Sequence, residues 1–231
     1  EGTLRWTWGP APVPFASSPI RSSPAIGWDG TIYIGAGGGL HAVNPDGTTR
    51  WRFVLDELNY TDSTASPAIG NDGTLYMLAG KLFALRPDGS KQWEFADGHD
   101  PMVSLYLNQN DSVAIASEGT LVFSGSAASL YAVDSQGRER WHTNGLFEFG
   151  GFCGLYKTPA IARNGTIHAM ASYRNGANIV FAFAPDGAQK WYAGGSGRYS
   201  DGNSPAVDEQ GNACFAASGW LSLPSETARK T

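Results

Sequence analysis

The sequence lacks most of the features that mark disulfide-rich or membrane-spanning proteins. It has only two cysteines in 231 residues, Cys153 and Cys214, too few for the disulfide framework of a small secreted domain. Whether the two thiols pair depends on an oxidising compartment, so the sequence leaves that question open. No apolar run approaches the ~20 residues that cross a bilayer, and no signal-peptide pattern is present. We therefore expect either a cytosolic chain or the mature part of an exported protein.

Basic residues are sparse and scattered. Lysine and arginine together number 16 against 21 aspartates and glutamates, which gives a formal net charge of −5. A protein that binds nucleic acid needs a cluster of cations to neutralise phosphates, and none is present. We expect no nucleic-acid partner.

Glycine, proline and aromatic residues are plentiful instead. The chain has 30 glycines and 13 prolines, 12% aromatic residues and only 16% charged residues. This composition is typical of many short strands joined by tight turns. A single all-β domain of 231 residues is long enough to bury a proper core.

An internal repeat organises the whole chain. Each unit begins near Ser-Pro-Ala and ends near a tryptophan; the units are Ser23–Phe53, Ser66–Phe95, Ser112–Thr143, Thr158–Ala193 and Ser204–Leu223. The tryptophans that end the units recur roughly every 42 to 50 residues, at Trp6, Trp51, Trp93, Trp141 and Trp191. The fifth unit stops before its tryptophan, whereas the segment Glu1–Trp8 (EGTLRWTW) repeats the end of a unit, as in DGTTRWRF at Asp46–Phe53.

Each unit predicts four antiparallel strands. Asp-Gly and similar pairs between short apolar runs favour hairpin turns, because glycine adopts the positive φ that such turns need. Four strands in about 40 to 45 residues are typical of a β-propeller blade. The sequence therefore predicts one all-β domain, a five-bladed propeller in which strand 1–8 completes the last blade and closes the ring. The blades cover about 9–53, 54–95, 96–143, 144–193 and 194–231 plus 1–8, with each tryptophan packed between blades.

The repeats resemble those of the PQQ-like (quinoprotein alcohol dehydrogenase-like) propellers, including the outer-membrane assembly lipoproteins. The residues that carry this resemblance are Ala42–Trp51, Ala84–Trp93, Ala132–Trp141 and Ala182–Trp191, together with the segments of the type SPAI-x-x-DGT-I-Y. Members of the family often have seven or eight blades rather than five. The resemblance implies export to the periplasm, the cell surface or the medium. The C-terminal SETARKT looks like a linker, so we expect a monomer or a module of a larger protein.

The connections between strands differ on the two sides of the predicted blades. One side carries the short, similar turns that contain glycine, whose aspartates we interpret as turn formers and not as metal ligands. The other side carries long connections rich in aromatic residues, where function tends to reside. Those connections predict a ligand-binding funnel rimmed by Tyr60, Asp62, His99, Asp100, Tyr156, Lys157, Arg198, Tyr199 and Asp201.

Three functions compete for that funnel. The first is non-catalytic binding of a glycan, a peptide or a protein, which the variable aromatic connections favour. The second is a carbohydrate-active lyase or glycoside hydrolase, which would require two carboxyl groups about 5–10 Å apart across the funnel. The third, a dehydrogenase using pyrroloquinoline quinone and calcium, is implied only by the family name. The adjacent-cysteine disulfide and the catalytic aspartate of such dehydrogenases have no counterpart in this sequence, so we expect no cofactor and no metal.

Overall fold

The structure is a computed structural model that describes residues 2–10, 20, 22–55, 65–96, 112–125, 129–143, 154–155, 158–172, 178–195, 204–217 and 220–222. The strands divide between two compact units, residues 1–112 and 113–231. Every regular element in the described residues is a β-strand, which confirms the all-β class. Among these residues no helix is long and apolar enough to span a membrane.

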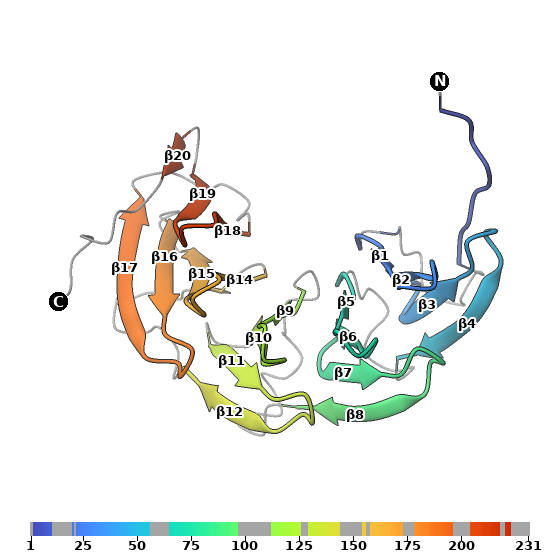
Figure 1. Cartoon of the computed structure of the whole chain (residues 1–231), viewed down its shortest axis with the longest axis horizontal. Helices are drawn as coiled ribbons and strands as arrows, with labels where there is room; N and C mark the ends of the chain where they lie inside the picture. Colours follow the sequence, from blue (N-terminus) through green and yellow to red (C-terminus); the bar gives the residue numbers. More distant parts are fainter. Residues whose placement is uncertain are drawn as a thin grey trace. The chain divides into compact units, whose positions relative to one another are not determined.

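The first unit contains two four-stranded antiparallel sheets (Figure 1). Blade 1 consists of β1 (Ala25–Ile26), β2 (Ile32–Ala36), β3 (Gly39–Val43) and β4 (Thr49–Val54). Blade 2 consists of β5 (Ala68–Ile69), β6 (Leu75–Leu78), β7 (Leu82–Leu85) and β8 (Lys91–Phe95). Both sheets keep the order of the sequence, as expected when each connection is short.

The second unit contains three sheets. Blade 3 consists of β9 (Ala114–Ile115), β10 (Leu121–Ser124), β11 (Leu130–Val133) and β12 (Glu139–His142). Blade 4 consists of β14 (Ala160–Ile161), β15 (Ile167–Ser172), β16 (Asn178–Phe183) and β17 (Gln189–Gly195). Blade 5 consists of β18 (Ala206–Val207), β19 (Ala213–Ala217) and β20 (Trp220–Ser222).

Two features depart from the predicted pattern. A short strand, β13 (Gly154–Leu155), pairs with the end of β15 beyond the part that β14 covers. The segment 2–10, predicted to contain a strand, forms no β-ladder with any strand in the described part of the chain. Among the described residues the segment is joined to blade 1 through side chains, since the indole N–H groups of Trp6 and Trp8 donate to Pro45 O and Thr49 Oγ1.

The turns explain why the repeat needs glycine. In the first turn of blade 1 the backbone of Gly30 has φ +81°, and in the second turn Gly47 has φ +88°. A Cβ at Gly47 would lie 2.8 Å from the indole of Trp6. Glycine is therefore required at this second turn for two reasons. The positive φ strains any other residue, and a side chain there would collide with the ring of Trp6.

The predicted role of the tryptophans is confirmed between blades 1 and 2 and between blades 3 and 4. The indole N–H of Trp51 in blade 1 donates to the carbonyl of Pro87 in blade 2 at 2.9 Å, and Trp141 in blade 3 donates to Pro185 in blade 4 at 2.9 Å. Each ring covers the glycine of the turn it reaches, Gly89 or Gly187. The tryptophan thus satisfies its polar atom while it packs its ring against the next blade.

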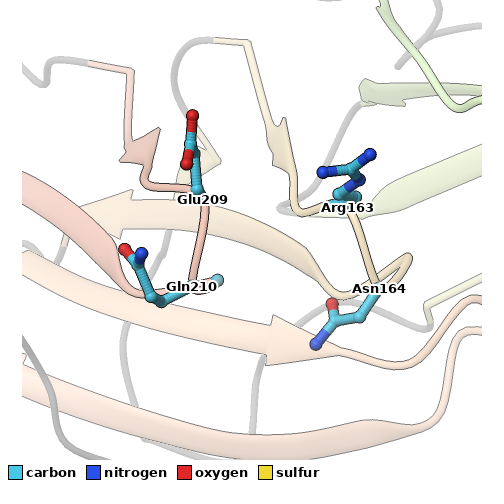
Figure 2. A pocket seen from close by; sticks show the side chains of 5 residues that line it. Arg163, Asn164, Glu209 and Gln210 are labelled. Atoms are coloured by element: carbon cyan, nitrogen blue, oxygen red, sulfur yellow. The ribbon is translucent and has the colours of Figure 1, made fainter.

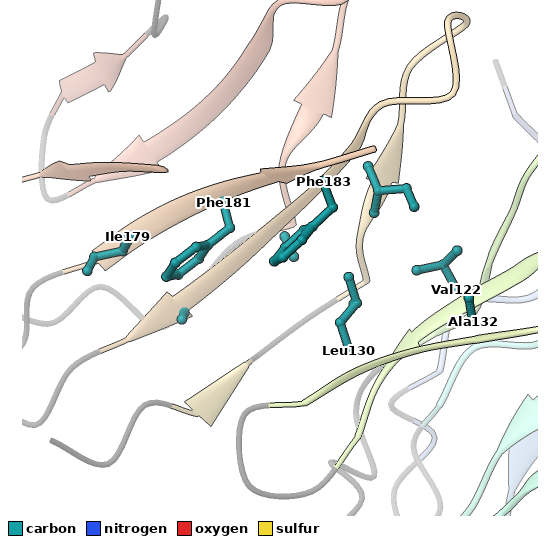
Figure 3. Close-up of a cluster of buried hydrophobic side chains, with 9 residues drawn as sticks. Val122, Leu130, Ala132, Ile179, Phe181 and Phe183 are labelled. Atoms are coloured by element: carbon teal, nitrogen blue, oxygen red, sulfur yellow. The ribbon is translucent and has the colours of Figure 1, made fainter. Parts of the chain in front are cut away.

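The hydrophobic cores lie between neighbouring blades. Alternate residues on each strand face one neighbour, because side chains along a strand point to opposite faces. Between blades 3 and 4 the core contains Leu130, Phe181 and Phe183, which are all 1% exposed or less (Figure 3). Tyr33, Leu40 and Met77 belong to the corresponding core between blades 1 and 2.

Candidate functional site

The nine residues predicted to rim a funnel all lie outside the described residues, and their convergence stays a prediction. Their place in the topology is clear from the strands that flank them. Tyr60 and Asp62, for example, belong to the connection between β4, which ends at Val54, and β5, which begins at Ala68. Each such connection leads from the outermost strand of one blade to the innermost strand of the next.

In each blade the short turns lie at the end of the strands opposite to the long connections. Because the strands alternate in direction, the connection between the first two strands and the connection between the last two lie at the same end. We call this end the turn side and the end with the long connections the loop side. The structure describes the turn side in detail.

Aspartates on the turn side act as turn formers, as predicted. In the first turn of blade 1 the backbone N–H of Thr31 donates to Oδ1 of Asp29 at 3.0 Å. In the second turn both the N–H and the hydroxyl of Thr48 donate to Asp46, at 2.9 and 2.6 Å. These bonds stabilise the carboxylate form and lower the pKa of both aspartates, that of Asp29 to about 2 with further help from the Arg50 guanidinium.

In blades 1, 2 and 4 a side chain from the outer strand donates a hydrogen bond to the first turn of the same blade. In blade 1 Nη1 of Arg50 donates to Oγ1 of Thr31 and to Oδ2 of Asp29, both at 2.8 Å. In blade 4 Lys190 Nζ donates to Oγ1 of Thr166 at 3.1 Å. Both basic residues immediately precede the repeat tryptophan, so in these two blades the hydrogen bond to the first turn lies next to the tryptophan in the sequence. These charged groups are therefore engaged within their own blade.

A hollow of about 300 Å³ opens on the turn side between the first turns of blades 4 and 5. Figure 2 shows Arg163 and Glu209 standing on the two turns with their charged groups on the same side of the hollow. Asn164, Gln210 and Gly211 complete its lining. The hollow offers charges and amides but no thiol or imidazole, so its lining can bind a small polar group and supplies no nucleophile of that kind.

Sequence reasoning missed this hollow because it assigned the turns a purely geometric role. One signal was present: Arg163 and Glu209 occupy the same position of two successive repeats and carry opposite charges. No group of three or more histidines, cysteines, aspartates and glutamates within the described ranges could hold a metal ion. Cys214 is a free thiol, and Cys153 lies outside the described residues.

His168 is the most perturbed ionisable group on the strands of the described blades. It is 1% exposed, and neither ring nitrogen has a hydrogen-bond partner. Burial, and secondarily the nearby positive charge of Lys190, lower its pKa to about 4. Its ring lies 5.6 Å from that of Trp191, as Tyr33 lies 5.8 Å from Trp51 in blade 1. The imidazole thus fills a packing position of the repeat and is neutral near pH 7.

Comparison with known proteins bears on the fold. No protein-family model matches the chain, and no curated protein matches it in sequence. The crystal structure of BamB from Moraxella catarrhalis is similar, with a TM-score of 0.54 and 17% identity over 91% of this chain and 74% of that one. A protein of unknown function from Bacteroides caccae is also similar, with a TM-score of 0.52 and 15% identity over 80% of this chain and 64% of that one. The likeness to BamB, together with the antiparallel sheets, shows a β-propeller architecture.

Proposed function

We propose that this protein is a non-catalytic binding propeller that holds a protein or peptide partner on its loop side. The observation that carries the proposal is the asymmetry between the two sides. Aspartates of the turn side, such as Asp29 and Asp46, accept hydrogen bonds from the residues of their own turns. The connections of the loop side carry tyrosines, a histidine and charged residues that blade packing does not require.

The proposed site is the rim of a central funnel. Tyr60 and Asp62 recur as Tyr199 and Asp201 in the connection that precedes the fifth repeat. Aromatic rings with a polar tip provide contact area with little loss of conformational entropy, and aspartates select the polar groups of the partner. His99, Asp100, Tyr156, Lys157 and Arg198 complete the proposed rim.

The propeller we propose has five blades in one closed ring and is exported. Five sequence repeats support the number of blades. The resemblance of the repeats to outer-membrane assembly lipoproteins, joined to the structural likeness to BamB, supports a periplasmic or cell-surface location and a protein partner. We expect the chain to act as a monomer or as a module of a larger protein.

A thermal-shift screen tests this function. The wild type and the variants Tyr60→Ala and Tyr199→Ala are heated with a panel of extended peptides and, separately, with oligosaccharides. A ligand at 100 times its Kd stabilises the protein by ~2.7 kcal/mol. Asn71→Ala, in an exposed first turn, is the matched control on the turn side.

The proposal predicts that peptides stabilise the wild type and Asn71→Ala but not the two tyrosine variants. Stabilisation by oligosaccharides alone would assign the funnel to glycans and overturn the proposed class of partner. A peptide that stabilises every variant equally would place the binding site away from the funnel. In that case the turn-side hollow beside Arg163 and Glu209 becomes the next surface to test.

A further inference from the structure

The turn-side hollow has its floor where the first turn of blade 5 meets the first turn of blade 4. A Cβ at Gly211 of blade 5 would lie 3.6 Å from Nδ2 of Asn164 and 3.8 Å from Cβ of Ala162 in blade 4. The two turns are therefore close neighbours, and both belong to the second unit. Because glycine has no side chain, the space beside this point stays open and forms part of the hollow of about 300 Å³.

Hydrogen bonds within each turn hold the lining in place. In blade 4 the N–H of Thr166 donates to Oδ1 of Asn164 at 3.0 Å. In blade 5 the N–H groups of Gln210 and Asn212 donate to Oδ1 of Asp208 at 3.0 and 2.8 Å. The turns thus use the oxygen of the Asn164 amide and the carboxylate of Asp208. The amide nitrogen of Asn164 makes no hydrogen bond within the described residues, so it is free to donate to a ligand.

One position of the first turn differs in every blade, namely the second residue before the glycine. Its side chain is exposed in all five blades, so blade packing does not determine its type. From blade 1 to blade 5 the residues at this position are Trp28, Asn71, Ser117, Arg163 and Glu209. A charge occurs only in blades 4 and 5, the two blades that flank the hollow, and the two charges are opposite.

Neither of these two charges is neutralised within the described part of the chain. The ion pairs that the structure describes include neither Arg163 nor Glu209, whereas Asp29 on the first turn of blade 1 pairs with Arg50 at 2.8 Å. The two side chains also do not pair with each other, although their charged groups stand on the same side of the hollow (Figure 2). The hollow therefore presents a separate positive group and a separate negative group.

A ligand with two opposite charges suits this pair better than a ligand with one. A lone carboxylate is attracted by Arg163 and repelled by Glu209, and a lone ammonium group experiences the reverse. A molecule that carries both groups gains a charge-assisted hydrogen bond at each end. The volume of the hollow lies at the lower end of the roughly 300–1,000 Å³ of ligand pockets, so it suits one small molecule.

We propose that this hollow binds a small zwitterion, a molecule with one carboxylate and one ammonium group, of which a free amino acid is the simplest kind. The guanidinium of Arg163 and Nδ2 of Asn164 donate hydrogen bonds to the carboxylate of the ligand. The carboxylate of Glu209 accepts a hydrogen bond from its ammonium group. The inference depends only on the turns of blades 4 and 5, so it can fail or hold independently of what the loop side binds.

A titration followed by NMR tests this site. The probes are glycine, β-alanine and 4-aminobutyrate, three zwitterions that differ only in the number of methylene groups between the charges. Propionate and propylamine, which carry one charge each, are the control compounds, and the ionic strength is kept constant. The signals observed are the backbone amides of the two turns, 162–165 and 208–211, and saturation of their shifts gives Kd.

Four variants separate the two charges of the site from charge in general. Arg163→Gln and Glu209→Gln each remove one charge. Arg163→Glu combined with Glu209→Arg exchanges the two charges and keeps both. Arg138→Gln, on the exposed second turn of blade 3, is the matched control on the turn side. Because the position of Arg163 and Glu209 holds five different residue types in the five blades, we expect these variants to fold, and circular dichroism checks that they do.

We expect at least one zwitterion to bind about tenfold or more tightly than propionate and propylamine. Each single variant, Arg163→Gln or Glu209→Gln, should weaken that binding by about fivefold or more, whereas Arg138→Gln should leave Kd within about twofold. The exchanged pair should bind within about threefold of the wild type, because the zwitterion can bind in the reverse direction.

Three results would overturn the proposal. The first is the absence of saturable shifts with all three zwitterions. The second is equal binding of a zwitterion and of propionate or propylamine, which would reduce the site to a single charge. The third is a folded exchanged pair that binds no better than the single variants, because recognition would then not depend on two opposite charges.

Discussion

The buried imidazole of His168 makes the second unit sensitive to mild acid. In an unfolded chain the pKa of histidine is near 6.5, whereas in the folded protein that of His168 is lowered to about 4. The folded state therefore binds fewer protons than the unfolded state between these two values. The contribution of the neutral His168 to stability is fully present above about pH 6.5 and is lost as the pH falls towards 4.

The size of the effect follows from the two pKa values. The full difference corresponds to a loss of about 3 kcal/mol, most of which has occurred by pH 4.5. His168 is 1% exposed and neither ring nitrogen has a hydrogen-bond partner, so neither water nor a hydrogen bond stabilises the protonated imidazole. Lys190, whose positive charge also lowers this pKa, strengthens the effect.

His168→Tyr removes the ionisable group and keeps an aromatic ring at the position. Blades 1 and 2 carry Tyr33 and Tyr76 there, each packed on the repeat tryptophan at 5.8 and 5.9 Å. Urea unfolding of the wild type and the variant at pH 7.5, 5.5 and 4.5 measures the free energy of unfolding. Between pH 7.5 and 4.5 we expect the variant to lose about 2–3 kcal/mol less of its free energy of unfolding than the wild type loses.

His142→Gln is the control for this experiment. His142 is partly exposed, so this variant measures the effect of removing a histidine that is not enclosed between blades. Burial also lowers the pKa of His41, but that contribution is common to all three proteins and cancels in the comparison. Equal acid sensitivity of the wild type and His168→Tyr would refute the assignment of a neutral buried imidazole.

Three further predictions concern the turns and the blade contacts. Gly187→Ala should destabilise the protein by more than ~1 kcal/mol beyond Gly119→Ala, because both glycines have positive φ but only Gly187 lies under a tryptophan ring; urea midpoints that agree for the two variants would contradict this. Trp51→Phe should lower the free energy of unfolding by about 1–3 kcal/mol, since it removes the 2.9 Å bond to Pro87 and part of the ring that packs on Gly89; an unchanged Tm would show that this contact contributes nothing. Arg50→Gln should raise the pKa of Asp29 from about 2 without restoring the ordinary value, because the Thr31 N–H still donates to the carboxylate. If the pKa of Asp29, measured by NMR, is unchanged in the variant, the contact between Arg50 and Asp29 is refuted.

Much of the blade architecture could be predicted because each repeat encodes it locally. Glycine at the turns and tryptophan at the unit ends leave little choice of conformation, so the four-stranded sheets and the packing of Trp51 against the next blade could be predicted from the repeat. The strand β13 could not be predicted, because Gly154–Leu155 lies in a connection without periodicity and pairs only by the extra length of β15.

The candidate sites were harder to predict for a different reason. The turn-side hollow depends on how two turns 46 residues apart approach each other, and sequence spacing within one turn carries no such information. The lack of hydrogen-bond partners at His168 likewise depends on the blades that enclose it. The rim residues of the loop side were predicted from residue type and topology, because the spacing of the repeat does not determine how side chains of different connections converge.

Hydrogen–deuterium exchange of the protein with a stabilising peptide tests whether the loop side is the binding surface. We expect slower exchange in the loop-side segments 56–64 and 196–203, with unchanged exchange in the turns around Asp29 and Asp72. Protection confined to the turn side, or spread evenly over both sides, would contradict the assignment of the loop side as the binding surface.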